Sequence, residues 1–460
     1  MLLVGALTLA FCHFSIYCIY LAINGSPPLA ASRVKTKVSP VSVNGSFPFI
    51  TYSAYFYHHS NETVRFQTIG FSKCRPENES MRLMIGNASF PMWSQVLDYS
   101  CPNIQNCVWA DYSFYADVPV TVDRSQEVKI ALDNATIVVG VTESSVEERP
   151  SGLEVCVAPL YYYNHWVRVI EFIELYRQQN ASHFFVYVSS VSRLVEDLLE
   201  VYQLKGLVTV VRWPELPKID STTDNVFRFG QNAAIMDCLR RSAAKFVAVV
   251  DMDDYTVVRN ETLLGYLERK EREDPTISAF RFDMVMAHQE PRVGNLTDWR
   301  SIGFEGLEAA MISDDQINYK SIVMPERVEV VTPHLPIVTG RMRGGEGVHQ
   351  NLVVSKDVGV SYHVRYANGL YRQIYGLSDQ KIQTKEALYA AEIVENVKSN
   401  FTQIMDSFSR SHADLTIPAT AEVMDDCNRY KPGECQTPYL SCRDKMESVD
   451  TWIYAKSMKI

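Results

Sequence analysis

Between residues 154 and 251 the sequence alternates between short apolar runs and longer segments with helical spacing. The apolar runs predict strands at 154–158, 183–188, 207–213 and 245–251, and the segments between them predict helices at 165–179, 192–206 and 230–244. Ser192 can cap the second of these helices, and Gly206 can end it. Strands that alternate with helices through short links favour a mostly parallel sheet with crossover helices, which is an α/β fold.

The last of these strands runs directly into three carboxylates, Asp251, Asp253 and Asp254, in the segment KFVAVVDMDDYTVV. Ligands of such sheets bind beyond the carboxyl ends of the strands. Side chains two apart on an extended chain face the same way, so the D-x-D pair can act together. One carboxylate can reach a ribose while the other binds Mg²⁺ or Mn²⁺ on a nucleoside diphosphate. The alternative is aspartates that only cap the turn after a strand.

The remaining sequence divides by composition. Small, polar and proline-bearing residues indicate a stem at 24–45, and short aromatic and β-branched runs indicate a small β-rich domain at 46–148. The α/β domain then covers 152–410, with extended segments at 320–338 and a helix at 384–401, and a cysteine-bearing extension covers 411–460.

The N-terminal run at 2–23 has no charged side chain and is long enough to span a membrane. It predicts a transmembrane signal anchor at 1–23, with a signal peptide cleaved near 28–32 as the alternative. The basic residues after the run favour a cytosolic C-terminus. Ten N-x-S/T sequons favour the secretory lumen instead, where an even set of cysteines outside the run suits disulfides.

The formal net charge is -10, and no block of Lys and Arg is present. Phosphate backbones need a basic face, so nucleic acid is not expected as a partner.

The ordered motifs from about 154 to 366 resemble glycosyltransferase family 92. They include VCVAPLYYYNHW (155–166), GLVTVVRWPELP (206–217), GQNAAIMDCLRRSAAKFVAVVDMDD (230–254), KSIVMPERVEVVTPH (320–334) and HVRY (363–366). The resemblance implies a GT-A-like fold and an inverting, metal-dependent transferase. It also implies a hexose, galactose above all, moved from a UDP-sugar to a glycan acceptor in the Golgi. Asp251 and Asp253 take the place of the family's D-x-D pair. Asp254 stands where the family often has Glu, and Val364 departs from the family's HYR.

Other residues are candidates for narrower roles. His363 is a candidate third metal ligand, against a strand-end histidine bonded to backbone, and His334 is a weaker one. Arg365 can bind diphosphate in a forked geometry, or it can form a surface ion pair. Tyr161 can stack on uracil, or it can pack in the core.

An inverting transfer also needs a base for the acceptor hydroxyl. Glu305, Asp314 and Asp315 are the candidates for this base, with solvated or capping carboxylates as the alternative. Two other functions stay open for the chain. One is an inactive glycan-binding protein of the secretory pathway, and the other is a metal-dependent phosphoesterase.

Overall fold

The computed structural model describes residues 39–43, 46–73, 81–97, 108–132, 135–144, 149–216, 226–289, 292–308, 310–339, 348–366, 382–420, 423 and 442–455. The predicted membrane anchor at 1–23 lies outside these residues, as does most of the predicted stem. Within the described part of the chain, no helix has both the length and the apolar character required to cross a membrane.

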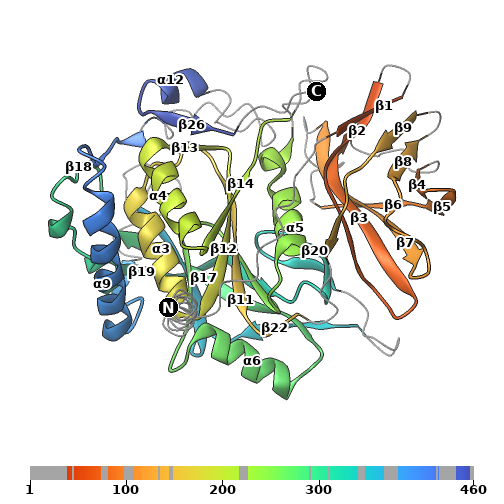
Figure 1. Cartoon of the computed structure of the whole chain (residues 1–460). Helices are drawn as coiled ribbons and strands as arrows, with labels where there is room; N and C mark the ends of the chain where they lie inside the picture. Colours follow the sequence, from red (N-terminus) through yellow and green to blue (C-terminus); the bar gives the residue numbers. More distant parts are fainter. Residues whose placement is uncertain are drawn as a thin grey trace, which may run out of the picture.

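The N-terminal domain consists of two packed β-sheets, drawn at the right of Figure 1. The larger sheet contains β1 (Ser39–Val43), β2 (Ser46–His58), β3 (Thr63–Lys73), β6 (Trp93–Val96), β7 (Trp109–Pro119) and β10 (Thr142–Ser144). The smaller contains β4 (Arg82–Ile85), β5 (Ala88–Pro91), β8 (Val128–Leu132) and β9 (Ala135–Val138). Strand pairs are antiparallel apart from β10 on β2, as a small antiparallel domain requires. Strand β1 comes from the predicted stem.

The second domain is built on one large sheet with the order β14-β12-β11-β15-β19-β17-β23-β16. The strands before the acidic cluster are β11 (Leu153–Leu160), β12 (Ala181–Val188), β14 (Val208–Arg212) and β15 (Phe246–Val250). Those after it are β16 (Asp254–Val258), β17 (Ile277–Gln289), β19 (Ala310–Val323), β22 (Gln350–Val354), β23 (Gly359–Tyr366) and β24 (Ile382–Glu386).

The expectation of a mostly parallel sheet holds only for the first half of this sheet. Strands β14, β12, β11 and β15 are parallel and joined by helices, as the alternation predicts. Beyond β15, strand β19 runs antiparallel to both β15 and β17, and β16 runs antiparallel to β23. Strand β17 runs parallel to β22 and β23, so the later half of the sheet combines parallel and antiparallel pairs and the whole sheet is mixed.

Helices cover both faces of the large sheet. The first face carries α3 (Trp166–Gln178), α4 (Arg193–Leu204), α6 (Leu263–Glu273) and α9 (Ala391–Phe408), and the opposite face carries α5 (Gln231–Arg241). The predicted cap of α4 is present, since the Ser192 side chain accepts a hydrogen bond from the Val195 backbone N–H. Helix α9 begins at Ala391, not at 384 as predicted, because residues up to Glu386 pair with β19 as β24.

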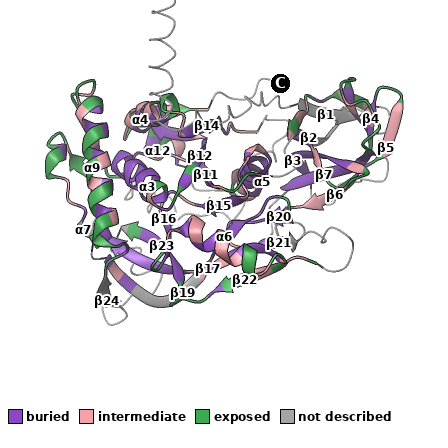
Figure 2. Ribbon diagram, turned by 60° about the horizontal axis from the view of Figure 1, so that its bottom comes forward, coloured by how far each residue is buried: buried purple, intermediate pink, exposed green. Residues whose placement is uncertain are grey.

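Helix α5 joins the two domains through one continuous core. Apolar residues of α5 and of the large sheet pack with Tyr52, Phe71 and Trp109 of the β domain. Figure 2 draws this junction between α5 and β3, and the residues that meet there are buried. The β domain is therefore packed onto the face of the large sheet that carries α5.

Asp237 on α5 is the polar centre of this junction, and its side chain is fully buried. The hydroxyls of Tyr55 from β2 and Tyr187 from β12 each donate to its carboxylate at 2.5 Å, and Arg241 forms an ion pair with it at 2.5 Å. Burial and the Asp237 charge raise the pKa of both tyrosines well above the usual value, so both keep the proton that they donate. One carboxylate thus ties the β domain, the sheet and α5 together.

A disulfide and a C-terminal strand add two further connections within the α/β domain. Cys156 on β11 forms a disulfide with Cys238 on α5, as the even set of cysteines predicts. Strand β26 (Trp452–Tyr454) of the predicted C-terminal extension pairs with β13 (Ser190–Ser192). The extension therefore packs against the α/β domain.

Replacing Asp237 with Ala should lower the free energy of unfolding by about 3–5 kcal/mol, because Arg241 stays buried without its counter-charge. Chemical denaturation of the full-length protein measures this. The matched control is Asp406→Ala, whose carboxylate forms an exposed pair with Arg300 and should change the free energy by less than about 1 kcal/mol. Equal effects of the two changes would contradict the central role of Asp237.

Candidate active site

The three carboxylates lie in the turn between β15 and β16, at the carboxyl end of a central strand. The turn is closed by a hydrogen bond from the Asp254 backbone N–H to the Asp251 carbonyl oxygen at 3.0 Å. The Asp251 side chain is 34% exposed and the Asp253 side chain 13%, whereas that of Asp254 is fully buried. The turn thus separates two carboxylates that solvent reaches from one that it does not.

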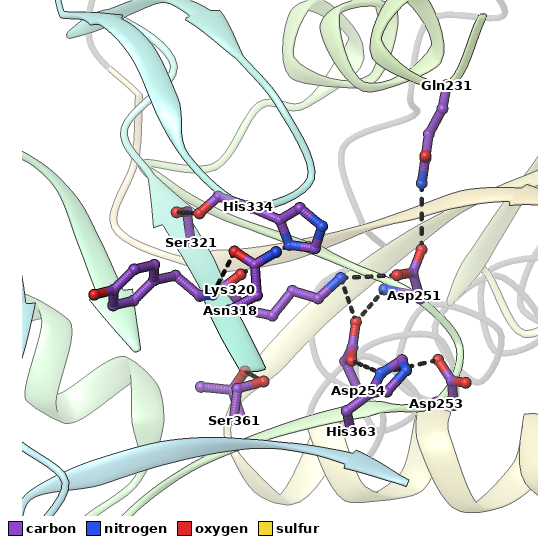
Figure 3. A network of polar contacts seen from close by, with 12 residues as sticks. Gln231, Asp251, Asp253, Asp254, Asn318, Lys320, Ser321, His334, Ser361 and His363 are labelled. Carbon is purple, nitrogen blue, oxygen red and sulfur yellow. Dashed lines mark hydrogen bonds and ion pairs between the residues drawn. The ribbon is translucent and has the colours of Figure 1, made fainter. Parts of the chain in front are cut away.

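Asp254 has both carboxylate oxygens engaged within the protein (Figure 3). Its Oδ2 accepts from Lys320 Nζ at 2.6 Å and from the Asp251 backbone N–H at 2.8 Å. Its Oδ1 lies 2.6 Å from His363 Nδ1. Asp254 therefore has no oxygen left over for a cation, and it serves to hold its neighbours in place.

His363 faces Asp254 across the β16–β23 ladder, where the two residues are register partners. Arg365 Nε donates to His363 Nε2 at 2.8 Å, so in the neutral ring the proton sits on Nδ1, toward Asp254. Arg365 Nε also lies 3.2 Å from Asp253 Oδ2. A carboxylate that fixes the tautomer of a histidine is the usual support of a metal-binding imidazole.

Asp253, Asp254 and His363 each offer a ligand atom, and these atoms lie within 4.8 Å of one another. Because both oxygens of the buried Asp254 have internal partners, Asp253 and His363 are the pair that could hold a cation directly, with Arg365 leaving His363 Nε2. A carboxylate oxygen and an imidazole nitrogen suit Mn²⁺. Of the predicted metal set, the structure thus brings Asp253 and His363 together, while Asp251 faces Lys320 and Gln231.

Lys320 is the site residue that the sequence analysis did not single out. It lies on β19, is 1% exposed, and contacts Asp251 Oδ2 at 2.7 Å as well as Asp254. The one local signal was a lysine at the head of the apolar run KSIVM. Burial alone would lower the pKa of Lys320, but Asp251 and Asp254 outweigh it and raise this pKa above the usual value.

The two exposed carboxylates stay ionised for the same reason. Burial acts to raise the pKa of Asp251, yet the ammonium of Lys320 leaves it well below the usual range. For Asp253, burial is again opposed, here by Arg365 and His363, and its pKa is also lowered. Both groups are therefore negative at neutral pH, as ligands of a cation or of a ribose hydroxyl must be.

The wall above Asp251 is formed by α5 and the turn before it. Gln231 Nε2 lies 3.5 Å from Asp251 Oδ1 at the start of α5. The preceding residues Arg228, Phe229 and Gly230 all have positive φ. A Cβ on Gly230 would meet the Phe71 ring at 2.4 Å, so only glycine fits there. The β domain therefore shapes this turn directly.

The other predicted residues fall into three groups. Tyr161 is half-buried, with its ring 5.0 Å from that of Phe229 in the wall just described. His334 lies beside Lys320, with its Nδ1 bonded to the Tyr319 carbonyl oxygen at 3.1 Å and no described contact with the carboxylates (Figure 3). Glu305 begins the short helix α7 (Glu305–Glu308) and Asp314 and Asp315 lie on β19, but their side chains are outside the described part of the structure.

Residues 151–419, more than half of the chain, match the family model described as Glycosyltransferase family 92. The chain belongs to glycosyltransferase family 92. The family resemblance of the ordered motifs is thereby confirmed, and the acidic turn, Lys320 and His363 all lie inside the family region.

Two Caenorhabditis elegans proteins are described as glycosyltransferase family 92 proteins. One is 26% identical over 146 residues, which cover 30% of this chain and 29% of the relative. The other is 25% identical over 275 residues, which cover 56% of this chain and 49% of the relative. The chain thus matches about half the length of these relatives or less.

Solved structures show only distant similarity. S. aureus TarS 1–349 in complex with UDP-GlcNAc has a TM-score of 0.28 and 14% identity, covering 64% of this chain and 80% of that chain. Glucosyl-3-phosphoglycerate synthase from Mycobacterium tuberculosis, in complex with Mn²⁺, UDP and its glucosyl product, has a TM-score of 0.25 and 12% identity over 55% and 80%. Similarity this low does not support conclusions about the activity or ligands of this chain.

Lys320→Met should lower the free energy of unfolding by about 3–5 kcal/mol, because it leaves the buried Asp254 without a full counter-charge. The control is Lys398→Met, since Lys398 also contacts two carboxylates, Glu308 and Glu395, but on the surface. The control should cost less than about 1 kcal/mol. Urea unfolding at neutral pH measures both, and a loss in the control equal to that in Lys320→Met would contradict the role of Lys320.

Proposed function

We propose that the protein is a GT-A-like, inverting glycosyltransferase that moves a hexose, galactose above all, from a UDP-sugar to a glycan acceptor. The observation that carries the proposal is the ionised pair Asp251 and Asp253 at the carboxyl end of β15, with His363 held beside them by the buried Asp254. Membership of family 92 supports transferase chemistry. The choice of donor sugar rests on the family resemblance alone.

The residues present fit a divalent cation, which we take to be Mn²⁺, with Mg²⁺ as the other hard cation of the same class. Asp253 and His363 would hold it, with Asp251 adjacent. When bound, such a cation neutralises charge on the departing diphosphate.

The other residues of the site would bind and orient the donor. Asp251 would accept a hydrogen bond from a ribose hydroxyl. The half-exposed Arg365 would pair with the diphosphate. Tyr161 lies where the uracil ring can stack against the wall formed with Phe229.

In the proposed reaction the acceptor oxygen attacks the anomeric carbon on the face opposite the diphosphate. The new C–O bond forms as the bond to UDP breaks, and the acceptor proton passes to a base. Glu305, Asp314 and Asp315 remain our candidates for that base.

We further propose a membrane-anchored enzyme of the Golgi or a related secretory compartment, with its catalytic domain in the lumen. Supporting this, five of the six described sequon residues are exposed, namely Asn61, Asn87, Asn180, Asn260 and Asn295, whereas Asn400 is half-buried and donates to Glu174. The Cys156–Cys238 disulfide also suits an oxidising compartment.

The test is calorimetric titration of UDP into the full-length protein from a secretory host, with and without Mn²⁺. UDP should bind at least about ten-fold more tightly with Mn²⁺, a difference of about 1.4 kcal/mol, because the cation links the phosphates to Asp253 and His363. Asp253→Asn should abolish the difference.

The control for this titration is Asp406→Asn, an exposed carboxylate on α9, which should bind UDP as the wild type does. Well-folded wild-type protein that bound UDP equally with and without Mn²⁺ would overturn the metal-dependent mechanism. Protein that bound glycans but no UDP would instead support an inactive glycan-binding function.

A further inference from the structure

An exposed aromatic side chain lies at the seam between the β domain and the catalytic domain. Trp93 begins β6, the last strand on its side of the larger sheet, and 41% of it is exposed. We define the Trp93 platform by the side chains gathered around this indole: Trp93, Tyr115, Arg65, Asp117, His59 and Glu329. Five of them come from the β domain, and Glu329 comes from β20 (Val328–Val331) of the catalytic domain.

Trp93 stays partly exposed although two side chains contact its ring. Tyr115 is its register partner on β7, and the two rings stack at 5.8 Å with an interplanar angle of 24°. Tyr115 therefore covers one side of the indole, and Arg65 approaches the ring with its Cζ at 5.3 Å from the centroid. Strand β6 ends the described order of the sheet, and Trp93 on it is 41% exposed.

Arg65 holds the polar groups around the indole in fixed positions. Its guanidinium binds both oxygens of Asp117, at 2.7 and 3.1 Å, and reaches Glu329 at 3.3 Å. It also lies 2.7 Å from His59 Nε2. Arg65 itself is only 9% exposed, whereas the side chains of Asp117 and Glu329 are 39% and 41% exposed. Two oriented carboxylates thus face solvent beside a partly exposed indole.

The platform is connected to the active site by a single hairpin. Strand β20 pairs with β21 (Pro336–Thr339), and Glu329 lies near one end of this hairpin. At its other end, His334 contacts the backbone of β19 next to Lys320. Figures 1 and 2 both draw β20 between β6 and β7 on one side and the large sheet on the other. The hairpin therefore links the Trp93 platform to the strand that carries Lys320.

We propose that the Trp93 platform binds a neutral sugar unit of the acceptor glycan, remote from the sugar that receives the transferred hexose. This rests on the proposed function, since it assigns the outer part of that acceptor. The C–H face of a pyranose is apolar and can pack on the exposed part of the indole, since aromatic side chains supply large apolar contact area. Its ring hydroxyls can donate to the carboxylates of Asp117 and Glu329, and an exposed carboxylate pair disfavours an acidic ligand.

The probe is a set of neutral N-glycan oligosaccharides and their single monosaccharides, tested against the full-length protein by saturation-transfer NMR and titration. Wild type and Trp93→Phe should bind the oligosaccharides, and Trp93→Ala should bind them about ten-fold more weakly. Val138→Ala, an exposed apolar residue elsewhere on the β domain, is the background control and should bind as the wild type does. Glu329→Gln is a second variant that removes one charge and leaves Trp93 in place, and it should also weaken binding.

Kinetics separate the platform from the catalytic site. In Trp93→Ala the KM for an oligosaccharide acceptor should rise about ten-fold, while the KM for a short acceptor and the Kd for UDP stay unchanged. Equal oligosaccharide binding by wild type and Trp93→Ala would overturn the platform, as would binding of basic peptides in place of glycans. Trp93-dependent glycan binding in a protein that binds no UDP would support the platform and overturn the proposed transferase.

Discussion

Asp254 is a carboxylate without access to solvent, and the arrangement of the whole site depends on how its charge is met. One oxygen accepts a hydrogen bond from the ammonium of Lys320, and the other lies against the imidazole Nδ1 of His363. A buried charge left without partners costs several kcal/mol, so these three side chains have little freedom to move apart. Asp251 and Asp253 are placed by the same turn. Asp251 and Asp253, which would contact a ligand, are thus positioned by the turn that the buried Asp254 holds in place.

A second buried carboxylate extends this order away from the site. Asp237 binds Tyr55, Tyr187 and Arg241 on the far side of α5, while the first residue of the same helix, Gln231, reaches toward Asp251. Helix α5 therefore connects the domain junction with the acidic turn. The Cys156–Cys238 disulfide fixes this helix to β11 as well. The β domain contributes to the site by constraining α5 and the left-handed turn in front of it.

The sequence predicts the part of the fold whose signals are local. Helical spacing and a capping Ser192 were enough for α3, α4 and α5, and the acidic turn followed from its place after an apolar run. The antiparallel pairing of β19 with β15 is a contact between distant segments, which no local period encodes. Lys320 escaped prediction for that reason, because it meets Asp251 only through that pairing. The sequence includes Asp254 in the acidic cluster but does not predict its supporting role, since adjacent aspartates differ in burial only once β16 has paired with β23.

The shared core around α5 has a consequence for how the chain is made. The β domain is synthesised before the α/β domain, and its aromatic face, with Tyr52, Phe71 and Trp109, is fully covered only after Trp213 and α5 have been made. Uncovered apolar surface of this kind is prone to aggregation in a nascent chain. A polypeptide stopped before Gln231 would present that face to other molecules. The order of synthesis therefore gives this chain a period of exposed aromatic surface that the finished molecule does not have.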